Sequence, residues 1–210
     1  MNDNMSNLKR NCNMKKILMM VVAAMMATVS VNAQQMFVKP MVGGTLSTLT
    51  GQDDSKMKFG LVGGAEFGYH VSEPFAVTAG VLVSMQGAKQ KDSELIKDAS
   101  TSMTYLNIPV LANYYIIPGL AVKAGIQPGF MLSQKAKYTM GGHDYEETSK
   151  DHVKTFDFSI PIGLSYEFSD FVIDARYNLG LTKVNKNAIE DSKDAKNSVF
   201  MLTLGYKIPF

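Results

Sequence analysis

The side chains with the greatest capacity for chemistry gather in one polar stretch, residues 141–152 (GGHDYEETSKDH). Imidazole and carboxylate groups are ligand types that bind divalent cations, and the stretch holds six of them: His143, Asp144, Glu146, Glu147, Asp151 and His152. Their spacing matches no diagnostic metal-ligand pattern, and charged runs are common in loops that face solvent. The sequence therefore favours a solvated surface loop, and we expect no metal ion and no cofactor.

One histidine, His70, stands apart from that stretch, at the end of a segment with alternating apolar residues. It could serve as a general base, as in barrel enzymes that edit lipids. Nucleophilic catalysis of that kind needs a serine and a carboxylate held beside the histidine, and the sequence pairs neither with His70. The glycines form no phosphate-binding motif. We therefore expect no catalytic residue and no enzymatic activity, and we place His70 at the periplasmic rim of the fold.

A second set of charged residues lies within otherwise apolar segments: Glu66, Lys123, Asp157, Glu167, Asp174 and Arg176. Side chains alternate between the two faces of a strand, and these six share the face opposite the large apolar residues. They could line a conduction path, or they could pair with one another in a closed interior. An eight-stranded barrel is just wide enough for its side chains to fill it. We therefore expect a structural ion-pair network in the lumen.

The segments that carry these charges alternate with period two, which is typical of strands with one apolar face. The pattern recurs in eight segments, at about 37–47, 58–70, 75–86, 105–114, 120–133, 156–168, 171–181 and 197–210. Three of their connections are tight (72–73, 117–119 and 169–170), and four are long and polar (48–57, 88–102, 135–153 and 183–197). Small outer-membrane barrels have this plan. The sequence predicts an all-β fold, an eight-stranded antiparallel up-and-down transmembrane β-barrel with short periplasmic turns and long extracellular loops.

Two tight turns set the register of the strands that they join. A two-residue loop between Phe168 and Phe171 pairs these residues and keeps the apolar side chains of both strands on one face. A three-residue loop at 117–119, with a left-handed glycine in it, pairs Ile116 with Leu120. Both registers agree with the predicted barrel.

Prolines in the predicted strands disfavour a closed sheet, because each proline removes one backbone hydrogen-bond donor from the ladder between two strands. Five fall at or in the predicted strands: Pro40, Pro109, Pro128, Pro161 and Pro209. We expect bulges or ladder ends at these positions.

Large aromatic residues mark both ends of the apolar face. Those near the short turns form an expected periplasmic girdle: Tyr69, Phe75, Tyr114, Phe168, Phe171, Tyr206 and Phe210. Such girdles lie at membrane–water interfaces, and Lys or Arg facing lipid at mid-bilayer costs roughly 2–4 kcal/mol. We therefore expect the apolar face to contact outer-membrane lipid. Alternation alone leaves open the inverse arrangement, a soluble lipocalin-like barrel with a lipid inside.

The beginning of the chain has the form of a secretory signal peptide. Lys15 and Lys16 precede an apolar run at 17–27, and a small-residue cleavage site ends at Ala33. The run is short for a membrane span, although an uncleaved anchor helix is the alternative. We expect an N-terminal extension and signal peptide at 1–33, cleaved after Ala33, and a barrel domain at 34–210. Translation could start at Met1 or Met14.

Composition limits the remaining classes of function. The chain has 210 residues, enough for one domain or one barrel, and a formal net charge of only +2, so no nucleic-acid partner is expected. Its one cysteine, Cys12, lies in the predicted leader. The exported part therefore has no disulfide, and its backbone ladder, packing or a surrounding membrane must hold it together.

Two segments have distinctive motifs: residues 174–182 (DARYNLGLT) and residues 105–111 (YLNIPVL). The first resembles the DARYNYGLTN segment of the PorT-like outer-membrane β-barrel family of Bacteroidetes. The second is similar to that family's YLEIPLLL strand, with Asn107 where Glu or Gln is usual. The resemblance covers about residues 35–210 and implies a small barrel in the bacterial outer membrane. Most members have no assigned activity, and the link of PorT itself to secretion does not transfer on these motifs.

The last segment, 197–210, ends on Phe210 and resembles the terminal strand of bacterial outer-membrane barrels. That resemblance implies recognition by the barrel-assembly machinery. We expect an integral outer-membrane protein with a structural or surface-interaction role and an unidentified surface partner. A narrow pore or a small-ligand transport or secretion-associated barrel is the alternative.

Overall fold

The computed structural model describes residues 35–50, 55–90, 96–140, 143–147, 155–183 and 195–210. The predicted signal peptide and its cleavage after Ala33 lie outside these ranges. Within them, no helix is long and apolar enough to cross a bilayer. The described elements are strands: β1 (Met36–Thr50), β2 (Ser55–Ser72), β3 (Phe75–Gln90), β4 (Ile96–Asn107), β5 (Val110–Ile117), β6 (Leu120–Met140), β7 (His143–Glu147), β8 (Phe156–Phe168), β9 (Phe171–Lys183), β10 (Lys196–Tyr206) and β11 (Ile208–Pro209).

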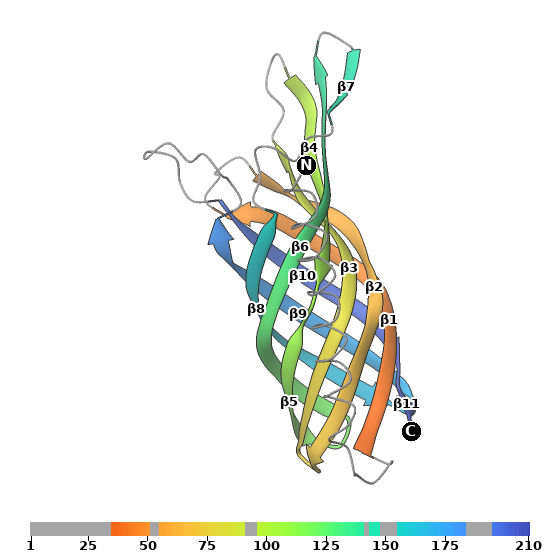
Figure 1. Cartoon of the computed structure of the whole chain (residues 1–210). Helices are drawn as coiled ribbons and strands as arrows, with labels where there is room; N and C mark the ends of the chain where they lie inside the picture. Colours follow the sequence, from red (N-terminus) through yellow and green to blue (C-terminus); the bar gives the residue numbers. More distant parts are fainter. Residues whose placement is uncertain (1–34, 51–54, 91–95, 141–142, 148–154, 184–194) are drawn as a thin grey trace, which may run out of the picture. The chain divides into compact units, whose positions relative to one another are not determined.

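The strands form one closed antiparallel barrel (Figure 1). The hydrogen-bonded order runs β10–β9–β8–β6, passes through β4 and β5 to β3, β2 and β1, and returns from β1 to β10. β4 and β5 are two parts of one long strand, and β11 continues β10 after Lys207. The predicted eight-stranded up-and-down barrel is therefore confirmed.

The hairpin of β8 and β9 has the predicted two-residue loop. Phe168 pairs with Phe171, and the same register continues to Leu164 opposite Ala175. Ser169 in the loop has a φ of 53°, a left-handed conformation that two-residue hairpin loops require.

The hairpin of β5 and β6 differs from the prediction by one residue at its tip. Tyr115 pairs with Ala121 as expected, but Leu120 pairs with Ile117 rather than with Ile116. Ile116 is the extra residue of a bulge, so the loop contains two residues instead of three. A bulge of this kind depends on local twist, which the alternation of side chains does not report.

Each of the five prolines lies at or opposite an interruption or an end of the pairing between its strand and one neighbouring strand, as predicted. Pro109 separates β4 from β5, and Pro128 of β6 faces that gap. The β1 ladder is interrupted at Pro40, and the ladder of β6 with β8 is interrupted opposite Pro161. Pro209 lies in the last pair of β11. The register is the same on both sides of these gaps, so they are lost hydrogen bonds and not bulges.

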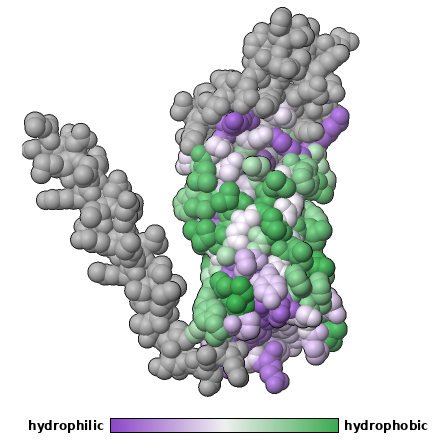
Figure 2. Space-filling model, turned by 90° about the vertical axis from the view of Figure 1, so that its right-hand side faces the viewer, coloured by the Kyte–Doolittle hydropathy of each residue, from purple (hydrophilic) through white to green (hydrophobic). Residues whose placement is uncertain are grey.

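Large apolar side chains cover the outside of the barrel wall (Figure 2). Ile162 and Leu204 are 55% and 48% exposed, whereas Thr203 is 2% exposed because it points into the barrel. The charged face lines the interior, so the inverse, lipocalin-like arrangement is wrong. The interior also holds four apolar residues, Met41, Val62, Leu82 and Met201, which form one cluster.

Paired strands continue beyond the barrel into two stretches that were expected to be loops. β3 extends to Gln90, β4 begins at Ile96, and β6 runs on to Met140 before the chain returns as β7. We call the paired parts at 88–90, 96–102, 135–140 and 143–147 the outer ribbon; it rises from the end of the barrel opposite the short turns (Figure 1). These segments are polar, so their strands lack the apolar alternation on which the prediction rested.

Replacing Gly119 with Ala is expected to destabilise the barrel by about 1–2 kcal/mol, the cost of a side chain in a left-handed conformation. Gly119 has a φ of 84°, and an added Cβ would lie 2.6 Å from the carbonyl oxygen of Glu167. Urea unfolding followed by circular dichroism measures the loss. Ser169→Gly is the matched control, because it relieves the same conformation in the other turn; equal losses in both variants would contradict this account.

Candidate functional site

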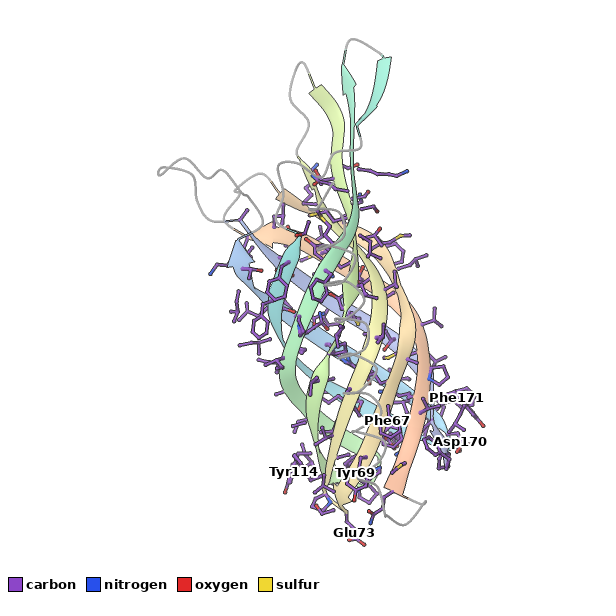
Figure 3. All side chains as sticks on the ribbon, in the orientation of Figure 1. Phe67, Tyr69, Glu73, Tyr114, Asp170 and Phe171 are labelled. Atoms are coloured by element: carbon purple, nitrogen blue, oxygen red, sulfur yellow. The ribbon has the colours of Figure 1, made fainter. Side chains whose placement is uncertain are left out.

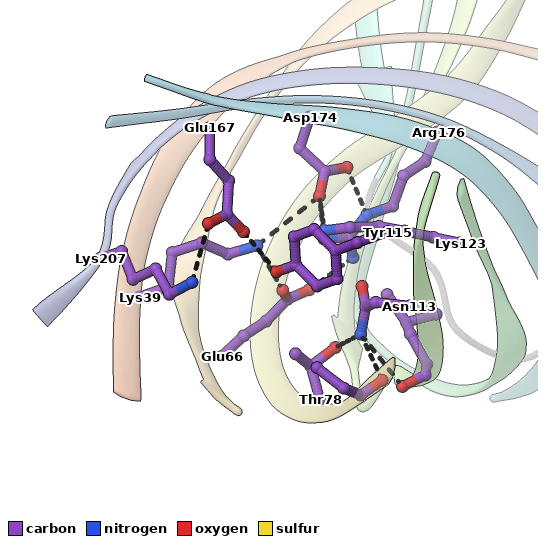
Figure 4. A network of polar contacts seen from close by, with 12 residues as sticks. Lys39, Glu66, Thr78, Asn113, Tyr115, Lys123, Glu167, Asp174, Arg176 and Lys207 are labelled. Atoms are coloured by element: carbon purple, nitrogen blue, oxygen red, sulfur yellow. Dashed lines mark hydrogen bonds and ion pairs between the residues drawn. The ribbon is translucent and has the colours of Figure 1, made fainter. Parts of the chain in front are cut away.

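Five charged side chains meet in the barrel interior (Figure 4). Asp174 contacts three cations: Arg176 Nε lies 2.6 Å from its Oδ1, and Lys123 Nζ and Lys39 Nζ lie 2.5 Å and 3.6 Å from its Oδ2. Glu66 contacts two of the same cations: Arg176 Nη1 lies 2.5 Å from its Oε1, and Lys39 Nζ lies 2.8 Å from its Oε2. All five residues are buried. We call them the central network.

Glycines beside the central network leave room for its long side chains. A Cβ on Gly205 would lie 2.9 Å from Cγ of Lys39, and a Cβ on Gly80 would lie 2.6 Å from Cγ of Glu66. Gly163 pairs with Arg176, as the hairpin register predicts. The small residues and the long charged residues of the interior face therefore fit together as one packed layer.

The structure brings four of the six sequence-predicted lumen residues into the central network: Glu66, Lys123, Asp174 and Arg176. Lys39 also belongs to the network but was not among the predicted lumen residues, although its position in the alternation places it on the same face. Asp157 and Glu167 also point inward, but each belongs to a different cluster.

Asp157 lies among neutral polar groups. Asn197 donates from Nδ2 to its Oδ2 at 3.2 Å, and the Thr182 hydroxyl donates to its Oδ1. Asn197 Nδ2 also lies 3.4 Å from the Tyr105 hydroxyl, and Phe158 donates its N–H to Thr182 Oγ1 at 3.0 Å. These contacts join β4, β8, β9 and β10 across the interior.

Glu167 belongs to a cluster at the mouth of the barrel near the short turns. Lys207 Nζ lies 2.7 Å from its Oε2, and the Tyr115 hydroxyl donates to its Oε1 at 2.5 Å. His70, which was expected at the periplasmic rim, lies here with Nε2 3.2 Å from Lys207 Nζ. The nearby ring of Phe37 is also part of this cluster.

The interior is filled at successive levels, which the inward-facing residues of β1 show in order. Phe37 lies in the mouth cluster, Lys39 in the central network and Met41 in the apolar cluster. Farther along, Thr45 donates to the Met85 carbonyl at 2.6 Å, and Ser47 donates to the Gly87 carbonyl at 2.9 Å. A second apolar cluster follows, formed by Met103, Tyr105 and Met131, with Leu49 packed against it. Apolar layers thus alternate with polar ones along the barrel.

The residues of the expected periplasmic girdle lie on the outer surface near the short turns: Tyr69, Phe75, Tyr114, Phe168, Phe171, Tyr206 and Phe210. Several rings contact one another; the Phe168 and Phe171 centroids lie 5.7 Å apart, and those of Phe171 and Tyr206 lie 5.3 Å apart. Figure 3 shows Tyr69, Tyr114 and Phe171 toward the end of the barrel away from β7.

The polar stretch at 141–152 lies mostly outside the description. Its backbone is described only at 143–147, where it forms β7, and the side chains of His143, Asp144, Glu146 and Glu147 are not described. Asp151 and His152 lie outside the described residues. Among the side chains that the structure describes, no group of three or more His, Cys, Asp or Glu residues could hold a metal ion.

Comparison with known proteins supports the assignment of this fold. Residues 24–186 match the model of a protein family described as "Outer membrane protein beta-barrel domain". The chain belongs to this family. It is therefore an integral barrel of the bacterial outer membrane, and the apolar face described above contacts the lipid of that membrane.

Several solved structures are similar to this chain at low sequence identity. Ail, the attachment invasion locus protein of Yersinia pestis, is 20% identical, with 83% of this chain and 99% of Ail covered and a TM-score of 0.47. Neisserial surface protein A is 13% identical, with 82% and 97% covered and a TM-score of 0.47. OprG from Pseudomonas aeruginosa is 14% identical, with 84% and 97% covered and a TM-score of 0.40. No curated protein sequence matches the chain.

Proposed function

We propose that this outer-membrane barrel is a non-catalytic surface-interaction protein that binds an extracellular partner through the outer ribbon. The observation that carries the proposal is the continuation of β3, β4 and β6 beyond the barrel, where β7 adds a further strand. A barrel needs no such extension to span a bilayer, because strands of about 9–11 residues suffice, whereas β6 alone has 21.

The ribbon has a strand edge that suits binding. β7 pairs with β6 through five residues, Ala136–Met140 against His143–Glu147, and with no other strand that the structure describes. The unpaired edge of a sheet can pair with an extended segment of another protein. The strand also carries three carboxylates, Asp144, Glu146 and Glu147, which favour a basic partner.

Deletion of the ribbon tip tests this proposal. In the variant, residues 136–147 are replaced by Gly-Gly, and proteoliposomes with either protein are mixed with washed surface fractions of the source bacterium. We expect the wild type to co-sediment material that the variant does not, while both keep the gel mobility of a folded barrel. Equal binding by variant and wild type, or by liposomes without protein, would refute the proposal.

The packed interior supports a closed barrel over the alternative of a narrow pore. Side chains contact one another across the interior at the mouth cluster, the central network and the Met103 cluster. In planar bilayers we expect no conductance steps above the protein-free background. Regular single-channel steps that disappear in a sample without barrel would favour the pore.

We further propose that the central network, Asp157 and Glu167 have a structural role, and that the aromatic residues near the short turns anchor the barrel at the periplasmic interface. We also propose that the chain is cleaved after Ala33, that the barrel-assembly machinery recognises its last strand, and that it is a member of the PorT-like group. Their support is the signal-like pattern, the amphipathic last strand and the DARYNLGLT segment at 174–182, respectively.

A further inference from the structure

The ammonium group of Lys207 is surrounded by the other four residues of the mouth cluster. We call these four the cage: Phe37, His70, Tyr115 and Glu167. Its Nζ is 2.7 Å from Glu167 Oε2 and 3.2 Å from His70 Nε2. The same atom lies 4.5 Å from the centre of the Phe37 ring and 5.9 Å from that of Tyr115. A carboxylate together with aromatic faces within about 6 Å is the combination that recognises ammonium groups.

The walls of this cage contact one another directly, and four different strands supply them. The His70 ring centroid lies 5.5 Å from that of Phe37 and 5.4 Å from that of Tyr115. Tyr115 donates its hydroxyl to Glu167 at 2.5 Å. Phe37 lies against Gly68, where an added Cβ would be 2.1 Å from the ring. Contacts of the walls with one another hold the cage in shape beside Lys207.

Lys207 also lies at the seam that closes the barrel. It is the residue between β10 and β11, and its N–H donates to the Asp170 carbonyl at 2.6 Å. After it, β11 pairs with β1, and Phe210 donates its N–H to the Met36 carbonyl at 3.1 Å. The side chain thus ties this short strand to β8, on the other side of β9 from β10.

We propose that Phe37, His70, Tyr115 and Glu167 form a preorganised ammonium-binding socket, which the native chain fills with its own Lys207. The socket holds β11 against β1, and it accepts a small alkylammonium ion when the lysine side chain is shortened. The ligand class follows from the cage: one positive charge, a short apolar stem and a hydrogen-bond donor for Glu167.

Chemical rescue of Lys207→Ala tests the proposal with n-propylammonium chloride as the probe, because this ion has the three carbons and the ammonium group that the substitution removes. In micelles, we expect the Phe210 amide of this variant to exchange with solvent about tenfold faster than in the wild type. Propylammonium at ten times its dissociation constant should raise the folded-to-unfolded ratio of the variant about elevenfold. It should leave the wild type unchanged, because Lys207 already occupies the socket.

Three comparisons separate a specific socket from general effects. Equal concentrations of sodium chloride and n-propanol should not rescue the variant, because neither is an organic cation. Adding Phe37→Leu to Lys207→Ala should abolish rescue, and Lys56→Met, at an exposed lysine, should leave Phe210 exchange unchanged. Rescue by sodium chloride or n-propanol, an equal response of the wild type, or unchanged exchange in both Lys207→Ala and Lys207→Met would overturn the proposal.

Discussion

Replacing Asp174 with Asn is expected to lower the free energy of unfolding by about 3–5 kcal/mol, the usual result of removing one partner from a buried ionic cluster. Asp174 contacts Arg176, Lys123 and Lys39, and it is 1% exposed. The amide has nearly the shape of the carboxylate but no charge. The variant therefore leaves three buried cations with Glu66 as the remaining carboxylate of the central network, and no solvent compensates for the loss.

Urea titration of the barrel in micelles, read out by the gel mobility of unheated samples, measures this effect. Asp157→Asn is the matched control, because Asp157 is also buried in the interior but accepts hydrogen bonds from Asn197 and Thr182. Its loss should be smaller, about 1.5–3 kcal/mol, as for hydrogen bonds from neutral donors to a charged group. Similar losses in the two variants would mean that charge pairing is not what makes Asp174 important.

Replacing Ile162 with Lys is expected to destabilise the barrel in a bilayer by about 2–4 kcal/mol. Ile162 lies midway along β8 and points outward. The same substitution at Phe168, at the end of that strand near the short turns, should cost about 0–1 kcal/mol, because a lysine there reaches the interface. The two variants carry the same charge on the same strand, so depth in the membrane is the variable.

Unfolding in lipid vesicles measures the difference between these two variants. A series through Leu164 and Tyr166, each changed to Lys, should show the loss shrinking with each step toward the turn. A loss that does not depend on depth would contradict the orientation of the barrel in the membrane.

The period-two alternation was sufficient to predict the strands and their faces, because it reports directly which side of a strand each side chain takes. It placed Ile162 and Arg176 on opposite faces of the sheet, and the two-residue loop then set the β8–β9 register. It missed the outer ribbon, because strands that pair above the membrane have no apolar face to mark them.

The partners within the interior could not be predicted in the same way. Alternation says that Lys39, Asp157 and Glu167 share a face, but not at which height in the barrel each one lies. Height depends on the tilt and stagger of the strands, which follow from all the registers together. For that reason the contact between Lys39 and Asp174 was not predicted, and neither were the separate partners of Asp157 and Glu167. The bulge at Ile116 was not predicted because it changes only the tip of one turn. The alternation of the two strands that the turn joins is the same with or without it.

The enclosure of the central network also constrains how the chain enters the membrane. Its five ionised groups meet across the lumen, with Glu66 on β2 reaching Arg176 on β9. A sheet that had entered the hydrocarbon while still open would present these groups to acyl chains. The three cations alone would cost about 6–12 kcal/mol if each costs 2–4 kcal/mol, and the two carboxylates would add to that cost. Such an intermediate would have a negligible population. Closure of the sheet and its burial in lipid must therefore occur in one cooperative step. Strands that have not yet paired can persist only where they remain in contact with water.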